Sequence, residues 1–309
     1  MRRVIGIGET IMDIIFKDGQ PTAAVPGGSV FNGIISLGRL KQDVTMITET
    51  GNDRIGQTIM NFMRDNGVDT SSVCMYKDGR SALSLAWLNE RNDAEYSFYK
   101  DYPKARLDVE WPDIKADDIV MIGSYYVLNP TLRDKTKDFL EYARSRGAFI
   151  YYDINFRSTH VAEAESLRET IKENFRFADV VRGSTEDFQH MFGTSDARKA
   201  YDEHISPYCK HVLSTDADGD VMVFTSGFTK CYPVKKIETV STIGAGDNFN
   251  AGCVYGFLRE CVTRDMLPAV GEDVFDRVVA MGCALAANVC QSFHNSISRE
   301  FAAEIGGRA

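Results

Sequence analysis

The residues best suited to chemistry lie together in the stretch Gly244-Ala245-Gly246-Asp247. Side chains this small let backbone N–H groups face a ligand, and the apolar run of helical spacing that follows (Phe249, Cys253, Phe257) predicts a helix N-terminus. Such a turn binds anions. Asp247 would repel a bound anion, and the role that fits it is accepting the proton of a hydroxyl that attacks a phosphoryl group. The alternative is a glycine-rich turn in which Asp247 only caps the helix.

Two other polar groups could bind hydroxyls. Gly27-Gly28 and Asn32 lead into a helical run, where close backbone approach and an amide side chain would suit a polyol or sugar. The alternative is a simple turn capped by Ser29. Asp13 follows the first strand, and carboxylates accept hydrogen bonds from paired sugar hydroxyls, although an exposed acid on a surface strand explains it equally well.

Asp153, Asn155 and Arg157 are spaced by two after a strongly apolar strand. If the backbone stays extended, the three side chains share a face. An acid, an amide and a guanidinium together suit an oxygen-rich, partly anionic ligand, and the alternative is a solvated strand end.

Two glycine patterns are misleading. The stretch Gly51–Thr58 has the glycine spacing of a P-loop but lacks its lysine. Gly6-Ile7-Gly8 lacks the third glycine of a dinucleotide fingerprint, which disfavours a dinucleotide oxidoreductase. The five histidines show neither metal-ligand spacing nor the context of a catalytic triad.

The elements that must position these residues alternate along the chain. Helical runs separate most of the apolar, β-branched segments; one is expected to begin at Asn129-Pro130 and end at Gly147, another to span Arg54–Asn66. This alternation predicts a mostly parallel sheet covered on both faces, with ligands bound beyond the C-terminal strand ends. The predicted strands are Arg3–Gly8, Asp43–Thr48, Asp118–Gly123, Ala148–Asp153, Asp179–Arg182, His211–Ser214 and Asp220–Thr225.

Two hairpins interrupt the alternation. Ile11–Phe16 and Thr22–Val25 flank Asp18-Gly19, and Ala82–Leu88 and Tyr96–Tyr99 flank the polar segment Asn89–Asp93. We expect them to form a separate small antiparallel sheet at the mouth of the core. Such a sheet could act as a lid that excludes water, which competes as a phosphoryl acceptor.

The composition describes an ordinary soluble globular protein. A chain of 309 residues with 44% hydrophobic content can bury a large α/β core. The net charge of −9 argues against nucleic acid or anionic membrane as a partner. Seven cysteines without C-x-x-C spacing, the lack of a secretory segment and the lack of a long apolar stretch predict a cytoplasmic protein.

Together these residues resemble the ribokinase-like, PfkB-type carbohydrate kinases, close to the fructokinase branch. Gly27-Gly28 with Asn32 resembles the N-terminal signature of that family, and the stretch 242–249 resembles its C-terminal signature. Gly51–Gly56 resembles its G-x-D-x-x-G turn, Asp153–Arg157 the D-x-N-x-R of fructokinases, and Ser184–Asp187 the N-x-x-E motif. The resemblance implies one kinase domain over residues 1–309 with a three-layer α/β/α core, a β lid near 11–25 and 82–99, and dependence on ATP and Mg²⁺.

The resemblance also assigns roles. Asp247 would be the general base, and Gly244, Ala245 and Gly246 would form the anion hole. The acceptor site would comprise Asp13, Gly27, Gly28, Asn32, Asn155 and Arg157; the nucleotide site Ser184, Ser214, Asp216 and Gly219 with Gly244 and Gly246; and the metal site Asp187. Apart from the resemblance, we add Lys100 to the acceptor site because it follows Phe98-Tyr99 and could meet a carboxylate.

Three departures from the family pattern bear on ligands. Ser241 replaces the acid that often helps hold a monovalent cation, which leaves potassium activation open. Asp216 replaces a glycine of the nucleotide-side T-x-G-x-x-G pattern, which leaves the nucleotide preference open. The Gly-Ala usual near the C-terminus is missing around Asn295.

The sequence therefore predicts an ATP-dependent kinase that phosphorylates a primary hydroxyl of a small sugar, with fructose favoured. Ribose, a nucleoside and 2-keto-3-deoxygluconate are alternative acceptors; Lys100 could meet a carboxylate, whereas Phe31 is expected to narrow the pocket against nucleosides. A non-catalytic sugar- or nucleotide-binding regulator is the alternative outside the kinases, but Asp247 would only weaken phosphate binding there. Apolar lid residues such as Leu85 and Trp87 predict a homodimer formed through the lid.

Overall fold

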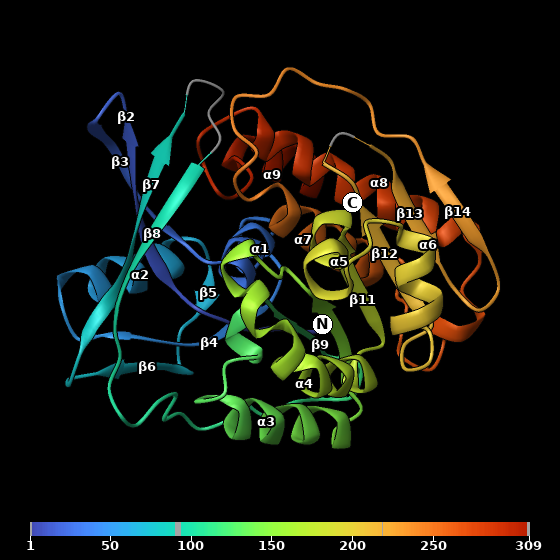
Figure 1. Ribbon diagram of the computed structural model, residues 1–309, viewed down its shortest axis with the longest axis horizontal. Helices are drawn as coiled ribbons and strands as arrows, with labels where there is room; N and C mark the ends of the chain where they lie inside the picture. Colours follow the sequence, from blue (N-terminus) through green and yellow to red (C-terminus); the bar gives the residue numbers. More distant parts are fainter. Residues whose placement is uncertain (1, 90–93, 218, 308–309) are drawn as a thin grey trace.

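A computed structural model describes residues 2–89, 94–217 and 219–307. The apolar runs form a ten-stranded sheet in the order β14-β13-β12-β11-β10-β9-β1-β4-β5, with β6 paired to β4 (Figure 1). Eight strands lie parallel, and β13 and β14 extend the sheet in antiparallel pairing. The predicted strand 220–225 is therefore antiparallel and lies between β12 and the edge strand β14. The strands are β1 (Val4–Ile7), β4 (Val44–Gly51), β5 (Val68–Asp69), β6 (Val73–Tyr76), β9 (Ile119–Gly123), β10 (Phe149–Asp153), β11 (Val180–Ser184), β12 (His211–Thr215), β13 (Val221–Phe224) and β14 (Thr229–Tyr232).

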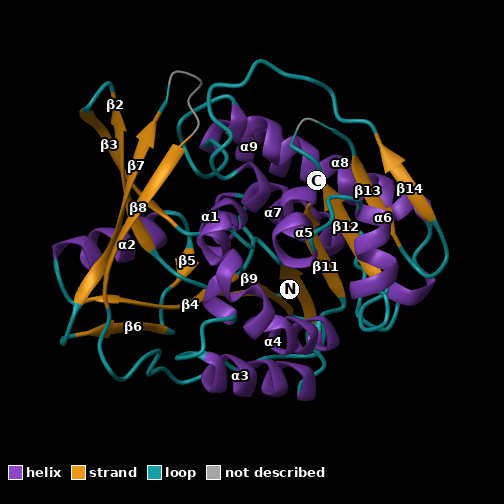
Figure 2. Cartoon of the chain, in the orientation of Figure 1, coloured by secondary structure: helices purple, strands orange, loops and turns teal. Residues whose placement is uncertain are grey.

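Helices cover both faces of this sheet, which confirms the predicted three-layer core (Figure 2). One buried cluster packs one sheet face against α1 (Ser29–Arg39), α2 (Arg54–Asp65), α7 (Ala245–Arg259), α8 (Glu272–Cys290) and α9 (Arg299–Gly307). The other packs the opposite face against α3 (Arg133–Ser145), α4 (Ala164–Phe177), α5 (Thr185–Phe192) and α6 (Ala197–Ala200). Short helical turns occur at Tyr125–Val127, Ser158–Glu163, Tyr201–Ile205 and Leu267–Ala269.

Two predicted helix boundaries had different outcomes. The stretch that resembles a P-loop begins α2 through a cap: Asp53 Oδ1 accepts a hydrogen bond from Gly56 N at 2.9 Å. The prediction that the next helix begins at Asn129-Pro130 is wrong, because α3 begins at Arg133. The Asn129 side chain accepts from Thr131 N at 2.9 Å and so closes a separate turn before the helix.

The two hairpins form the predicted second sheet, in the order β3-β2-β7-β8 (Figure 1, left). Its strands are β2 (Ile11–Lys17), β3 (Gln20–Gly27), β7 (Arg80–Leu88) and β8 (Ala94–Asp101). Within each hairpin the pairing is antiparallel, but the hairpins join through a parallel β2–β7 pairing that the sequence pattern did not predict. Of the predicted loop 89–93, residues 90–93 lie outside the described residues. We call this four-stranded sheet the lid.

Within the described part of the chain, none of the helices is both long and apolar enough to cross a bilayer.

Candidate active site

The glycine-rich turn begins α7 as the sequence predicted. Gly244 is the N-cap and has φ 80°, a conformation that favours glycine, and a Cβ there would lie 2.9 Å from Asn295 O. The Ala245 amide donates to Thr242 O at 3.2 Å and helps close the turn. Among the described residues, no hydrogen bond joins the amides of Gly244 and Gly246 to a protein acceptor, so both are free to donate to a ligand.

Asp247 lies in the first turn of α7, next to these amides. Asn32 donates from Nδ2 to Asp247 Oδ2 at 2.8 Å, which joins the first residues of α1 to those of α7. Burial raises the pKa of Asp247, and the bonds from Asn32 and Ser29 and the charges of Arg157 and Arg182 partly offset this effect. The carboxylate is therefore a stronger base than an exposed aspartate.

A buried arginine that the sequence analysis missed lies beside the turn. Arg182 of β11 donates from Nη1 to Asp153 Oδ1 at 3.0 Å and from Nη2 to Thr215 Oγ1. A Cβ at Gly246 would lie 3.1 Å from both terminal nitrogens of this guanidinium. Burial alone would lower the pKa of Arg182, but the nearby acids, Asp153 foremost, raise it, so the group is a permanent cation beside the Gly244–Gly246 turn. The sequence signal that could have found it is a charged residue, Arg182, directly after the apolar pair Val180-Val181 in a predicted strand.

Asp13 of β2 points into the space between the lid and the core, not out into solvent. Ser84 Oγ donates to Asp13 Oδ1, and Asn295 Nδ2 lies 3.4 Å from Asp13 Oδ2. A Cβ at Gly27 would collide with Asp13 Oδ2, so the glycine allows the strand to approach the acid. Burial raises the pKa of Asp13 to about 6 despite hydrogen bonds from Ser84 and Asn295.

Asn32 is buried, and its Oδ1 has no hydrogen-bond partner among the described residues. Gly28, at φ 134°, is the N-cap of α1, and a side chain there would collide with Glu9 O. Ser29 does not cap α1, as one interpretation of the sequence held, but bonds to Asp247. The structure thus brings Asp13, Gly27, Gly28 and Asn32 together around Asp247.

Asn248 and Asn295 fix this arrangement. Asn248 Nδ2 donates to Gly244 O and to Asn295 O, each at 2.8 Å, and Ser36 donates to Asn248 Oδ1. Asn295 is thereby linked both to the turn at Gly244 and to Asp13. Nothing in the sequence pattern indicated Asn295, because its partners lie far away in the chain.

Asp153, Asn155 and Arg157 do not share a strand face. β10 ends at Asp153, and Asn155 has φ 39°, so the extended backbone that the prediction required is absent. Asp153 instead points toward Arg182, and the charge of the exposed Arg157 acts on Asp247.

The predicted nucleotide-side residues lie at the ends of adjacent parallel strands, where Ser184 of β11 pairs with Thr215 of β12. Ser214 is buried in β12, and Gly219 follows Asp216 in the next turn; Asp218 lies outside the described residues. Asp216 Oδ1 accepts a hydrogen bond from Thr185 Oγ1 at 3.3 Å.

Asp187, the predicted metal ligand, forms a capping box with Ser184 at the start of α5. Its Oδ2 accepts from Ser184 N and Oγ at 2.7 Å, and its Oδ1 accepts from Phe156 N at 2.6 Å. In the part of the chain that the structure describes, no three His, Cys, Asp or Glu side chains gather as a metal site.

Lys100, proposed to meet a carboxylate, already has one within the protein. Its Nζ lies 2.8 Å from Glu9 Oε1. Phe31 does not form the pocket wall that we expected, because it is buried in the core near Phe62, with ring centroids 6.1 Å apart. Phe31 therefore does not narrow the acceptor pocket, and the expectation that it excludes nucleosides is wrong.

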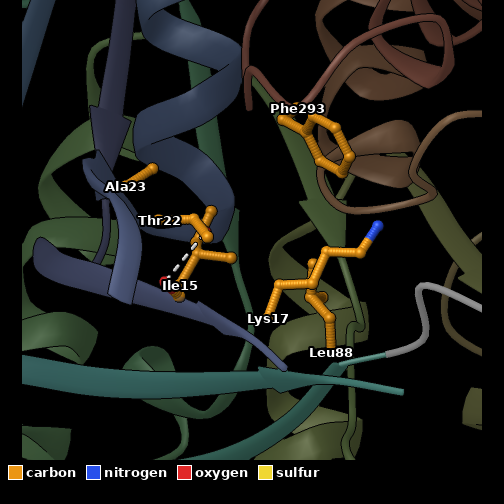
Figure 3. Close-up of a pocket in the computed structure, with 6 residues that line it drawn as sticks. All are labelled: Ile15, Lys17, Thr22, Ala23, Leu88 and Phe293. Atoms are coloured by element: carbon orange, nitrogen blue, oxygen red, sulfur yellow. Dashed lines mark hydrogen bonds between the residues drawn. The ribbon is translucent and has the colours of Figure 1, made fainter. Parts of the chain in front are cut away.

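An apolar pocket lies farther out on the face of the lid that carries Asp13. Figure 3 shows its lining: Ile15, Lys17, Thr22, Ala23, Leu88 and Phe293. Ile15 is two residues beyond Asp13 on β2, and Phe293 is two residues before Asn295, so both walls continue from the Asp13–Asn295 contact. The cleft therefore changes from polar near Asp247 to apolar toward the lid tip.

Comparisons with known proteins agree with this geometry. The model of the pfkB family carbohydrate kinases matches residues 1–300. Fructokinase-1 of Oryza sativa subsp. japonica is 26% identical over 260 residues and covers 80% of each chain. The 5-dehydro-2-deoxygluconokinase of Geobacillus thermodenitrificans is 27% identical over 247 residues, covering 75% of this chain and 72% of its own.

Solved structures share the fold at lower identity. The fructokinase of Vibrio cholerae O395, solved with fructose, ADP and calcium, superimposes with a TM-score of 0.83 at 21% identity, covering 97% of this chain and 96% of its own. The aminoimidazole riboside kinase of Salmonella enterica gives 0.84 at 17% identity and covers 99% of both chains. Because the family model matches residues 1–300 of the 309 in this chain, the chain belongs to the pfkB family of carbohydrate kinases.

Proposed function

We propose that this kinase transfers the γ-phosphoryl group of ATP to a primary hydroxyl of a small neutral sugar, with fructose favoured. One observation carries the proposal. A partly buried carboxylate, Asp247, stands beside two unpaired amides, those of Gly244 and Gly246, with the Arg182 cation adjacent. A site that only bound phosphate would be weakened by this carboxylate, whereas phosphoryl transfer to a hydroxyl needs it.

Asp247 would accept the hydroxyl proton as the bond to phosphorus forms. Its raised pKa makes it a better proton acceptor than an exposed aspartate. The hydrogen bond from Asn32 to Oδ2 fixes the orientation of the carboxylate toward the acceptor side of the cleft. The amides of Gly244 and Gly246, the α7 dipole and Arg182 would stabilise the negative charge of the transferring group.

ATP would lie over the ends of β11 and β12, near Ser184, Ser214, Asp216 and Gly219. Mg²⁺ would be held mainly by the phosphates and water, because the described residues offer no cluster of three or more ligand side chains. When bound, the ion neutralises phosphate charge and so favours attack by the hydroxyl. Asp187 is our candidate for the protein carboxylate that acts on this ion; its present hydrogen bonds hold the start of α5 and the backbone at Phe156.

The acceptor side supports a neutral sugar. Asp13, Asn32 and the Gly27–Gly28 backbone offer hydrogen-bonding groups without a cation, and Glu9 already neutralises Lys100. Fructokinases are among the relatives, which makes fructose the first acceptor to test.

A coupled assay of ADP release over fructose, ribose, a nucleoside and 2-keto-3-deoxygluconate tests this proposal. We expect kcat/KM for fructose to exceed that for the sugar acid by at least about tenfold, which is about 1.4 kcal/mol in transition-state binding. Binding of sugar and ATP without ADP release from any acceptor would favour the non-catalytic regulator and refute a kinase of this kind.

We also propose a cytoplasmic homodimer that associates through the outer face of the lid. Phe16 and Trp87 stack on that face with ring centroids 4.2 Å apart, and Trp87 is 41% exposed. Light scattering on the wild type and on Trp87→Asp tests the interface. A wild-type monomer at micromolar concentration would refute it.

A further inference from the structure

Lys100 belongs to the lid face that borders the acceptor site. It lies two residues after Phe98 on β8, so both side chains are on the same face of the strand. The Lys100 Nζ lies 5.0 Å from the centre of the Phe98 ring. Phe98 pairs with Ser84 of β7, and Ser84 donates to Asp13. Because successive strand residues alternate between faces, Lys100, Phe98, Ser84 and Asp13 lie on one face.

Glu9 holds this lysine. Both Glu9 oxygens are within 2.9 Å of Lys100 Nζ, and Tyr102 donates its hydroxyl to the same carboxylate. The pair is only partly exposed, with 34% of the Lys100 side chain and 25% of the Glu9 side chain accessible. The Glu9 carbonyl lies against Gly28, and the Glu9 charge contributes to the raised pKa of Asp13. Glu9 lies in the segment that joins β1 to β2 and is therefore a neighbour of the acceptor groups.

This arrangement determines how the site meets a charged acceptor. A sugar carboxylate that approached Lys100 would have to displace Glu9, and it would meet the negative charges of Glu9 and Asp13. The known relatives include kinases named for fructose and for a gluconate derivative, so acceptor charge differs between relatives of this chain.

We propose that Glu9 is a specificity-determining residue that occupies Lys100 and so restricts the kinase to uncharged acceptors. The proposal rests on the neutral-sugar activity inferred above. It differs from a purely structural role, in which the Glu9–Lys100 pair only holds the lid. Loss of a structural pair would change the kinetics of neutral and acidic acceptors alike, whereas loss of a specificity element changes their ratio.

The test measures kcat/KM for fructose and for 2-keto-3-deoxygluconate in the wild type and in Glu9→Gln. Glutamine keeps the shape and can still accept from Tyr102, but it releases the lysine charge. We expect the acid-to-neutral ratio to rise at least about tenfold, mainly through a lower KM for the acid, the scale of one charge-assisted hydrogen bond. Adding Lys100→Ala to Glu9→Gln should remove the gain.

A matched control variant separates the effect of the charge at Glu9 from the effect of a change in the net charge of the protein. Glu169→Gln on α4 breaks another Lys–Glu pair, Glu169 with Lys172 at 2.7 Å, and changes the net charge equally. It should leave the ratio unchanged. Lys100→Met with Glu9 intact is a second variant, which should not impair the sugar acid relative to fructose, because the lysine is already occupied.

Three results would overturn the proposal: an unchanged ratio in folded Glu9→Gln, equal losses for both acceptors, or a selective loss of sugar-acid activity in Lys100→Met. A wild type that uses another neutral sugar instead of fructose would refute only the fructose assignment, and the ratio would then be measured with that sugar. A wild type that prefers the sugar acid through Lys100 would refute both proposals.

Discussion

Asp13→Asn should stabilise the protein while it weakens sugar binding. The Asp13 carboxyl is buried between the lid and the core, and burial raises its pKa from 3.8 to about 6. This net value includes smaller contributions from the nearby charges of Asp247 and Glu9, which raise the pKa, and from hydrogen bonds donated by Ser84 and Asn295, which lower it. The folded protein therefore holds this proton more tightly than the unfolded chain does.

The sign and size of the effect follow from that difference. Below about pH 4 the carboxyl is protonated in both states and has no net effect. Between about pH 4 and pH 6 the unfolded chain releases its proton first, so the free energy of unfolding falls as pH rises. A difference of about 2 in pKa corresponds to roughly 3 kcal/mol, lost by the wild type above pH 6 and kept by Asp13→Asn. The asparagine fits because the Ser84 hydroxyl can rotate to accept a hydrogen bond from it.

Urea unfolding of both proteins at several pH values between 4 and 8 measures this difference. The stability advantage of Asp13→Asn should grow by roughly 3 kcal/mol across the range and then stay level. In the same variant, KM for the sugar should rise far more than KM for ATP. A variant that is equally or less stable at pH 8, with the same pH dependence as the wild type, would refute the raised pKa and the reasoning built on it.

Three further predictions concern the same cleft. Asp247→Asn should lower kcat by roughly two to four orders of magnitude with little change in substrate affinity, and single-turnover kinetics within tenfold of the wild type would exclude it as the base. Gly246→Val should lower kcat by about a hundredfold or more, because its side chain would press on Arg182 and block the anion-binding amide; a folded variant with normal kcat would remove the amide from the mechanism. Hydrogen exchange in segments 11–25 and 82–99 should slow when sugar binds, and unchanged exchange at saturating sugar would contradict closure of the lid.

Much of this molecule could be predicted from local sequence alone. Alternation of apolar runs with helical periods predicted the doubly covered parallel sheet, because each pattern specifies one way to bury apolar side chains. Asp18-Gly19 predicted a hairpin, and both residues have positive φ in the structure. The stretch 244–247 predicted a turn and a helix start, because small residues and helix periodicity act within a few residues.

Contacts between distant segments were decided only by the tertiary structure. Arg182 reaches Asp153 because β10 and β11 pair in one register, and Asn295 meets Asp13 across 282 positions of the chain. Glu9 neutralises Lys100 only because the fold places β8 of the lid next to the segment that follows β1. The extended backbone expected at Asn155 gave way to a left-handed turn.

The same distinction explains the wrong expectation for Phe31. A sequence shows that a side chain is apolar, but not whether its helix directs it toward the core or toward a ligand. In this fold α1 packs so that Phe31 faces the core near Phe62. Local patterns therefore determined which chemical groups the protein carries and where its strands and helices lie. The strand register and the packing of helices between the two sheets determined which charges are paired, because these depend on contacts between residues far apart in the chain.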